Sequence, residues 1–240
     1  VQRVIELHQQ GHTFVLDDTF PETLLGPAGP PGAGPAPDDV AVILYTSGTT
    51  ADPKGVLHSH NTLLSECRCT QAYHGLGAGE VLVMPSPVSH ISGLLYGVLL
   101  PVVLGATSVL MEVWDADAFC ALVARERGTF SAGATPFLQG TLEAAARGRH
   151  DLRSLRLFPC GGADVPPELI RRAIDQLGVR SGRGYGSTEF PSITSSAGPA
   201  VPAEKRATTD GAVIPPNRLV LRDEHGRPAP PGEPGEIWAR

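Results

Sequence analysis

Hydrophobic and polar positions between residues 40 and 177 follow two alternating patterns: short continuous apolar runs, and longer stretches with apolar residues three or four apart. The first pattern predicts buried strands and the second predicts amphipathic helices. The apolar runs predict strands over residues 40–45, 81–84, 107–111, 130–132 and 155–159. The helical spacing predicts helices over residues 61–73, 91–104, 115–127, 136–147 and 166–177. This alternation predicts an α/β fold with a largely parallel sheet. The run at 40–45 is continuously apolar, so we expect that strand to be buried on both faces.

The N-terminal residues follow other sequence patterns. Residues 1–10 carry apolar side chains at helical spacing and predict a helix that stops at Gly11, and residues 13–16 predict a short strand. Residues 26–37 consist almost entirely of Gly, Pro and Ala, which predicts an exposed linker rather than part of a core. A proline motif for partner binding is the less favoured alternative, because the segment lacks flanking basic or aromatic residues.

The C-terminal residues change character again after Gly211. Residues 218–221 and 236–239 predict strands joined by a turn-rich segment, which favours antiparallel β structure. We therefore expect a lead-in and linker over residues 1–37, an α/β core over residues 38–210, and the start of a truncated β subdomain over residues 211–240.

Composition narrows the class of protein. The chain has 240 residues, of which 41% are hydrophobic and 18% charged, as in ordinary globular proteins. The net charge of -6 weighs against nucleic acid as the main partner. No apolar run approaches the length of about 20 residues that a transmembrane helix needs.

Four cysteines occur in the chain, at positions 67, 69, 120 and 160. Only Cys67 and Cys69 are close in sequence, and no His stands at ligand spacing from them, so a zinc site is disfavoured. Reduced, partly buried thiols in a cytoplasmic protein are the better interpretation.

Residues 45–56 (YTSGTTADPKGV) carry the clearest candidate chemistry. Backbone N–H groups and hydroxyls in such a loop can bind the anionic oxygens of a phosphate, and a lysine adds a positive charge. The candidate phosphate ligands are Thr46, Ser47, Gly48, Thr49, Thr50 and Lys54. A Walker A loop is disfavoured, because Lys54 lies between Pro53 and Gly55 and a predicted strand at 56–59 follows instead of a helix. A polar turn without a ligand is the plain alternative.

The order of residues in this loop closely resembles the phosphate-binding signature of the adenylate-forming superfamily, which includes acyl-CoA synthetases, aryl-CoA ligases and the adenylation domains of peptide synthetases. The loop departs from that signature at Ala51, where the family usually has Gly. If the backbone needs a positive φ there, Ala costs about 1 kcal/mol relative to Gly.

Two further glycine-containing segments match the family in order and spacing. Gly161, Gly162 and Ala163 follow a predicted strand, and the resemblance places them against adenine; a plain strand-to-helix turn is the alternative. Residues 184–189 (GYGSTE) resemble the family's GYGxTE element. The resemblance implies that Tyr185 and Gly186 flank the nucleotide, that Thr188 contacts the α-phosphate, and that Glu189 helps to hold Mg²⁺.

His90 matches the position where acyl- and aryl-activating members place a His or aromatic residue near the carboxylate. Without that context, a cap or core role would be favoured for His90. Amino-acid-activating members place an Asp near this region, and residues 86–89 (SPVS) lack one. Apolar Ile91, Leu94 and Leu95 suit an acyl, alicyclic or aryl group. The string 85–97 (PSPVSHISGLLYG) is closest to cyclohexanecarboxylate–CoA-ligase-like and medium-chain acyl-CoA synthetases.

The resemblance implies a carboxylate that attacks the α-phosphorus of ATP, with Mg²⁺, to give an acyl-adenylate, followed by transfer of the acyl group to coenzyme A. The implied partners are therefore a small-molecule carboxylate, ATP and coenzyme A. Peptide-synthetase-type amino-acid adenylation and a non-catalytic nucleotide-binding fragment are the alternatives. We expect the chain to be an incomplete part of the large N-terminal domain, with weak or no turnover by itself.

Overall fold

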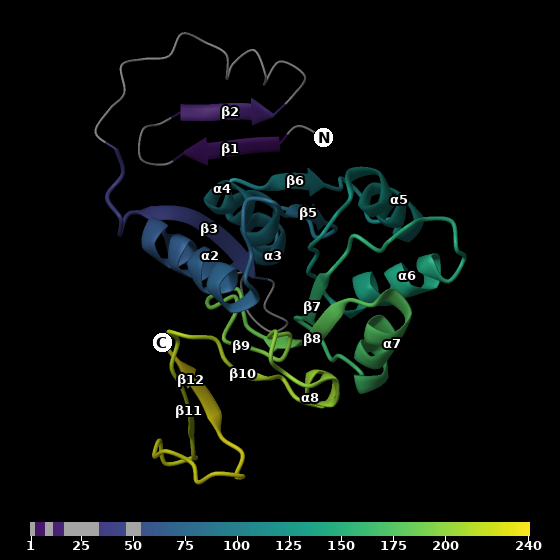
Figure 1. Ribbon diagram of the computed structural model, residues 1–240. Helices are drawn as coiled ribbons and strands as arrows, with labels where there is room; N and C mark the ends of the chain where they lie inside the picture. The colour runs from purple at the N-terminus through teal and green to yellow at the C-terminus, as the bar shows by residue number, and fades with distance from the viewer. Residues whose placement is uncertain (1–2, 8–11, 17–33, 47–53) are drawn as a thin grey trace. The chain divides into compact units, whose positions relative to one another are not determined.

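The computed structural model describes residues 3–7, 12–16, 34–46 and 54–240 (Figure 1). The chain divides into two compact units, Val1–Ala36 and Pro37–Arg240. In the first unit, β1 (Arg3–Leu7) pairs antiparallel with β2 (His12–Leu16). The strand predicted at 13–16 is confirmed, but the helix predicted at 1–10 is wrong. The segment is short for a stable helix, and a neighbouring strand supplies its backbone with cross-strand partners, so pairing overrides the local helical spacing.

The second unit is built around a mostly parallel sheet. β5 (Val81–Met84) pairs parallel with β6 (Thr107–Leu110), and β7 (Leu157–Gly161) pairs parallel with β8 (Arg180–Tyr185). Phe130 joins the two pairs through parallel bridges to Leu82 and Leu157. β9 (Thr194–Ser195) and β10 (Ala212–Val213) extend the sheet antiparallel beyond β8.

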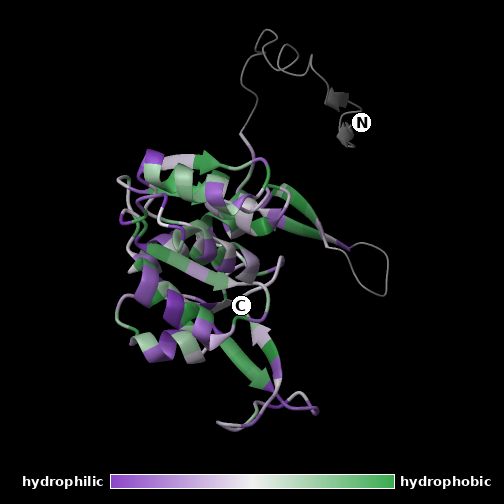
Figure 2. Cartoon of the chain, turned by 90° about the vertical axis from the view of Figure 1, so that its right-hand side faces the viewer, coloured by the Kyte–Doolittle hydropathy of each residue, from purple (hydrophilic) through white to green (hydrophobic). Residues whose placement is uncertain are grey.

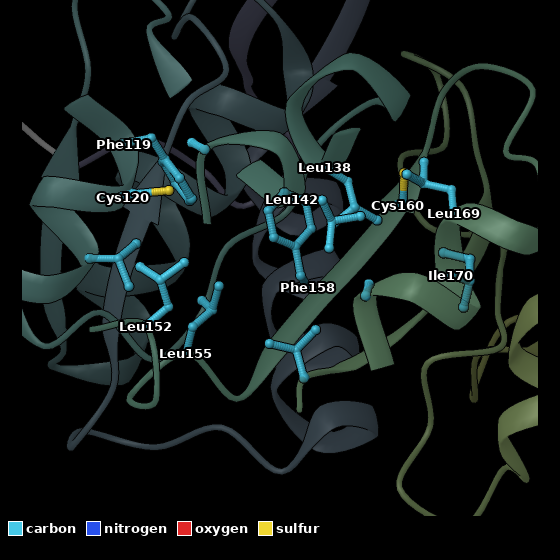
Figure 3. Close-up of a cluster of buried hydrophobic side chains, with 14 of the residues drawn as sticks. Phe119, Cys120, Leu138, Leu142, Leu152, Leu155, Phe158, Cys160, Leu169 and Ile170 are labelled. Atoms are coloured by element: carbon cyan, nitrogen blue, oxygen red, sulfur yellow. The ribbon is translucent and has the colours of Figure 1, made fainter. Parts of the chain in front are cut away.

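Helices cover both faces of this sheet. One face packs against α5 (Ala116–Glu126), α6 (Thr135–Ala145) and α7 (Pro167–Leu177). Phe119, Leu142, Phe158 and Ile170 are fully buried in this core, and Figure 3 shows their side chains gathered between strand and helices. In Figure 2 the helices of this unit carry hydrophilic and hydrophobic residues side by side, as expected of amphipathic helices that cover a sheet.

The other face packs against α2 (His60–His74) and a helical segment over residues 91–104. Leu82, Met84 and Leu157 point into this second core, whereas their neighbours Val83 and Phe158 point into the first, as the period of a strand requires. A parallel sheet covered on both faces is the arrangement that the sequence predicted, and the α/β fold is confirmed.

The helix predicted at 91–104 is confirmed, but its middle turn is widened. It consists of α3 (Ile91–Leu94), the π-helical turn η1 (Leu95–Leu99) and α4 (Leu100–Leu104). Pro101 has no N–H to donate, so the carbonyl of Gly97 lacks its usual helical partner. The hydroxyl of Ser108 donates to that carbonyl instead, at 2.5 Å. Tyr96 lies in this π-helical turn, a type of turn that is common at functional sites.

β3 (Val40–Thr46) and β4 (Lys54–Ser59) form an antiparallel pair. Burial of β3 on both faces is wrong: Leu44 is buried, but Ile43 and Tyr45 are 52% and 73% exposed. A continuous apolar run does not distinguish a strand buried on both faces from one with an exposed apolar face. The strand expected after the phosphate loop is confirmed as β4.

The remaining predicted elements agree with the structure, except that the strand predicted at 130–132 is reduced to isolated bridges at Phe130 and Gly133. Asp115 caps α5 by accepting from the N–H of Ala118 at 2.7 Å. After α8 (Ala203–Thr208), β11 (Leu219–Arg222) and β12 (Glu236–Ala239) pair antiparallel, as expected for the C-terminal segment. Among the described residues, no helix combines the length and hydropathy needed to cross a bilayer.

Candidate active site

A cavity of about 470 Å³ opens where β7 and β8 end. Ligands of open α/β sheets bind at the carboxyl ends of the strands, because the loops that follow converge there. Six of the residues singled out in the sequence line this cavity: His90, Gly161, Gly162, Tyr185, Gly186 and Thr188. They come from three separate stretches of the chain, which the fold brings together.

The other predicted site residues lie elsewhere. Thr46 and Lys54 face each other at the ends of β3 and β4, and the Thr46 hydroxyl lies 3.5 Å from the Lys54 carbonyl oxygen. Ala163 and Glu189 are exposed and do not line the cavity. Ser47, Gly48, Thr49 and Thr50, together with Ala51, lie outside the described residues.

The two glycines at the end of β7, Gly161 and Gly162, are required for different reasons. A Cβ on Gly161 would lie 2.4 Å from the carbonyl oxygen of Gly184 in the neighbouring strand, so the close approach of the two backbones excludes a side chain. Gly162 has a φ of +79°, which side-chain-bearing residues rarely adopt, and nothing lies within 4 Å of its ideal Cβ position. Gly162 lines the cavity, so a flat ligand can approach its backbone there.

Residues 187–190 form a tight turn after β8 that contains Glu189. The N–H of Ser187 donates to the carbonyl of Phe190 at 2.9 Å, and the N–H of Phe190 donates back to the Ser187 hydroxyl at 3.2 Å. The backbone N–H of Glu189 itself and the Ser187 hydroxyl lower the pKa of the Glu189 carboxyl, with smaller contributions from His58 and Lys54. Glu189 is therefore an ionised carboxylate with Lys54 in its electrostatic neighbourhood.

His58 is a residue of this site that the sequence did not reveal. It is buried in β4, on the same side of the strand as Val56, and its Nε2 lies 2.8 Å from the carbonyl oxygen of Thr188. This hydrogen bond joins the strand that carries Lys54 to the turn that carries Glu189. The sequence could have indicated its burial, because residues 56 and 58 point to the same face of a half-buried strand.

His90 both caps a helix and lines the cavity. It is the N-cap of α3, because its Nδ1 accepts from the N–H of Ser92 at 3.2 Å. Since Nδ1 accepts that bond, the neutral ring carries its proton on Nε2. His90 thus lines the cavity with a ring whose Nδ1 is fixed and whose other nitrogen can donate to a carboxylate oxygen.

One wall of the cavity is formed by residues that the sequence did not single out. Thr70 and His74 from α2, Tyr96 from η1 and Ser192 all line it, and the Tyr96 hydroxyl lies 2.5 Å from the Ser192 hydroxyl. Phe130, Phe137 and Ile214 add apolar surface. The cavity therefore extends well beyond the glycine turn.

The cysteines play a structural part. All four are free and buried. Burial raises the pKa of the Cys67 and Cys160 thiols to about 12 and that of Cys120 to about 11, so these three stay protonated near neutral pH. Within the described part of the chain, no group of three His, Cys, Asp or Glu side chains is placed to hold a metal ion.

Comparison with known proteins agrees with this geometry. The chain is 36% identical over 207 residues to the medium-chain fatty-acid–CoA ligase of Escherichia coli strain K12, covering 85% of this chain and 36% of that protein. It is 34% identical over 211 residues to a feruloyl-CoA synthase of Amycolatopsis, covering 87% of this chain and 42% of that protein. The chain thus spans less than half the length of these curated relatives.

Solved structures show the same fold. A benzoate CoA ligase from Burkholderia xenovorans LB400 superposes with a TM-score of 0.80 at 27% sequence identity, covering 92% of this chain and 44% of that one. The family model described as AMP-binding enzyme matches residues 2–240. The chain therefore belongs to the AMP-binding enzyme family.

Proposed function

We propose that this chain forms the nucleotide- and acid-binding part of an enzyme that activates a carboxylic acid with ATP and transfers the acyl group to coenzyme A. The observation that carries the proposal is the single cavity that joins the Gly161–Gly162 turn, Thr188 and His90. The names of the relatives support it, because the E. coli protein is named a fatty-acid–CoA ligase and the Amycolatopsis protein a feruloyl-CoA synthase.

In the first step, a carboxylate oxygen attacks the α-phosphorus of ATP and pyrophosphate leaves. This step brings several anionic oxygens together, so the protein must position the reactants and offset negative charge. Lys54 and the loop residues Thr46, Ser47, Gly48, Thr49 and Thr50 would hold the phosphates. Thr188 would contact the α-phosphate, and His90 would donate from Nε2 to the acid.

The adenine would lie between the turn formed by Gly161, Gly162 and Ala163 and the segment of Tyr185 and Gly186. The half-exposed ring of Tyr185 and the open space beside Gly162 suit a flat base. In the second step, the thiol of coenzyme A attacks the acyl carbon and AMP leaves.

A magnesium ion fits the chemistry of this site. Glu189 is ionised and hydrogen-bonded in a tight turn, and hard cations prefer carboxylate and phosphate oxygens. Glu189 would be the protein ligand and the nucleotide phosphates would supply further oxygens. The ion, when bound, would neutralise charge on the phosphates.

We also propose the organisation into a lead-in and linker over residues 1–37, a core over residues 38–210, and the start of a β subdomain from residue 211. A cytoplasmic location is part of the proposal, supported by the four free thiols.

The test is carboxylate-dependent exchange of labelled pyrophosphate into ATP, measured on the full-length product of the gene. Fatty, alicyclic, aryl and amino acids are compared, and coenzyme A is then added to detect the thioester. Lys54→Ala and Glu189→Gln should suppress exchange, whereas the exposed controls Lys205→Ala and Glu224→Gln should not. Exchange driven only by amino acids would favour peptide-synthetase-type adenylation. Binding of ATP without exchange for any acid would reduce the protein to a nucleotide-binding module.

A further inference from the structure

Three polar side chains form a stripe along the buried face of α2. Glu66, Thr70 and His74 are spaced four residues apart, so they lie above one another on one side of the helix. Their exposed fractions are 5%, 3% and 7%. A buried helix face is ordinarily apolar, and three consecutive polar positions on it call for an explanation.

Within the described part of the chain, each of the three side chains has an atom without a hydrogen-bond partner. These atoms are Oε1 of Glu66, Oγ1 of Thr70 and Nδ1 of His74. Buried polar atoms in folded proteins nearly always have a partner, because leaving one unpaired costs the free energy of desolvating it. A ligand that supplies the missing partners would remove that cost.

The stripe leads into the cavity. Thr70 and His74 line it together with Tyr96 and Ser192, and the Glu66 carboxyl lies within reach of the Ser192 hydroxyl. Tyr96 and Ser192 already bond to each other, and the Tyr96 hydroxyl also interacts with Thr70. The unpartnered atoms of α2 are buried at this wall.

The stripe occupies the second half of α2. α2 begins at His60, just after His58 contacts Thr188. The carbonyl of its last residue, His74, accepts from the side chain of Arg180, the first residue of β8, at 2.8 Å. A helix of this length spans roughly 20 Å. An acid whose carboxylate meets His90 would bring its far end to other walls of this cavity, and Thr70 and His74 form part of those walls.

The unpartnered atoms of the stripe act mainly as hydrogen-bond acceptors. Burial, with the charge of Arg180, lowers the pKa of His74 to about 4, and its ring also hydrogen-bonds to the Ala197 backbone. Neutral His74 therefore has one nitrogen left, Nδ1, as an acceptor. Glu66 adds a carboxyl oxygen and Thr70 a hydroxyl that can accept or donate. A matching ligand must bring hydrogen-bond donors.

We propose that Thr70 and His74, with Glu66 behind them, select a carboxylic acid that bears a hydroxyl group on the part of its acyl chain or ring remote from the carboxylate. The aromatic walls from Phe130 and Phe137 favour a ring or a compact chain as the carrier of that hydroxyl. A plain hydrocarbon acid would leave the unpartnered atoms of Thr70 and His74 without a donor. This inference rests on the proposed acid-activating function.

The test compares matched pairs of acids on the full-length protein: 4-hydroxycinnamate with cinnamate, 4-hydroxycyclohexanecarboxylate with cyclohexanecarboxylate, and 8-hydroxyoctanoate with octanoate. We expect the hydroxylated member of at least one pair to be preferred by about 10-fold or more in kcat/KM, as one well-placed buried hydrogen bond provides. Thr70→Val and His74→Leu should abolish that preference by raising KM for the hydroxylated acid, while the plain acid is used equally well or better.

Thr141→Val is the matched control, because Thr141 is also fully buried but donates to the Phe137 carbonyl at 2.7 Å and does not line the cavity. It should leave the preference unchanged. Equal use of both members of every pair by the unaltered protein would overturn the inference while leaving the acid-activating function standing, and would mean that the stripe holds only water. Failure of every acid to drive exchange would overturn both. The comparison on the unaltered protein does not depend on how well the variants fold.

Discussion

The imidazole Nε2 of His58 lies 2.8 Å from the backbone oxygen of Thr188, across 130 positions of sequence. The bond is partly buried and connects β4, which starts at Lys54, with the turn that contains Glu189. Thr62 adds a weaker contact, with its hydroxyl 3.4 Å from Nδ1 of the same ring. His58 therefore links β4 to the turn that contains Glu189, the candidate metal ligand.

Replacing His58 tests this coupling. His58→Ala removes the only side-chain partner that the described structure gives to the Thr188 carbonyl, and should lower the free energy of unfolding by about 1–2 kcal/mol. Because Lys54 and Thr188 are then less well positioned toward each other, KM for ATP should rise about 10-fold. Urea unfolding and steady-state kinetics measure the two effects.

The control for this change is His225→Ala. His225 lies in the loop between β11 and β12 with 64% of its side chain exposed, and its loss should alter neither stability nor KM. If both variants behave alike, the His58–Thr188 bond has no positioning role.

The buried acid in the α2 stripe makes stability depend on pH. Burial raises the pKa of Glu66 from 4.5 to about 7 in the folded protein. Between these values the unfolded chain has lost the proton and the folded chain keeps it, so the free energy of unfolding falls as pH rises. The slope for one group is about 1.4 kcal/mol per pH unit.

His74 opposes that effect over much of the same range. Its pKa falls from 6.5 to about 4 on folding, so between these values the unfolded chain binds the proton and stability rises with pH. The two slopes nearly cancel between pH 4.5 and 6.5. Glu66→Gln should therefore expose the His74 slope, with stability increasing by about 1.4 kcal/mol per pH unit across that window.

Urea unfolding at several pH values, for Glu66→Gln and for the unaltered protein, measures the difference in slope. Glu224→Gln, an exposed carboxyl in the C-terminal hairpin, is the control and should match the unaltered protein at every pH. Parallel curves for Glu66→Gln and the unaltered protein would show that Glu66 titrates in the same range in both states.

The ion pair of Arg156 and Glu80 offers a third test. Glu80 is 8% exposed and accepts from the guanidinium of Arg156 at 2.6 and 2.7 Å, with the Thr129 hydroxyl as a further donor. Arg156→Ala leaves a buried carboxylate with only Thr129, and should lower the free energy of unfolding by about 2 kcal/mol.

Arg153→Ala is its counterpart. Arg153 bonds to Asp151 through two nitrogens, but its side chain is 91% exposed. Water replaces such a partner readily, so thermal or urea unfolding should show no change. A loss of equal size in both variants would mean that burial does not govern the strength of the Arg156 pair.

Local sequence patterns predicted most of the second unit, because apolar runs and helical spacing reflect which residues each element buries. They failed where a distant partner decides the outcome. Pairing with β2 turned the expected N-terminal helix into a strand, and the exposure of Ile43 depends on what lies beside β3, which the run itself does not encode.

The candidate site was predictable only in part, for the same reason. The glycine and threonine motifs are continuous in sequence, so their residues could be named in advance. Glu66, Thr70 and His74 could not, because three polar residues spaced four apart predict an exposed helix face. In the structure that face is buried against the cavity, and only the tertiary fold reveals it.

The last prediction concerns the two glycines at the end of β7, Gly161 and Gly162. Gly161→Ala should be strongly destabilising, by about 2–3 kcal/mol, because the new methyl group meets the Gly184 carbonyl at 2.4 Å and neither backbone can move without disturbing the β7–β8 pairing. Gly162→Ala meets no atom but must hold a φ of +79°, at a cost of about 1 kcal/mol.

Gly148→Ala separates backbone strain from a role at the site. Gly148 has a φ of +66° and the same open surroundings, but it follows α6 and does not line the cavity. The Gly148 and Gly162 variants should lose similar stability in urea unfolding, since both force a methyl-bearing residue into the left-handed region. Only Gly162→Ala places that methyl group on the cavity wall, so only this variant should raise KM for ATP. Equal ATP kinetics in the two variants would contradict placement of the adenine against this turn.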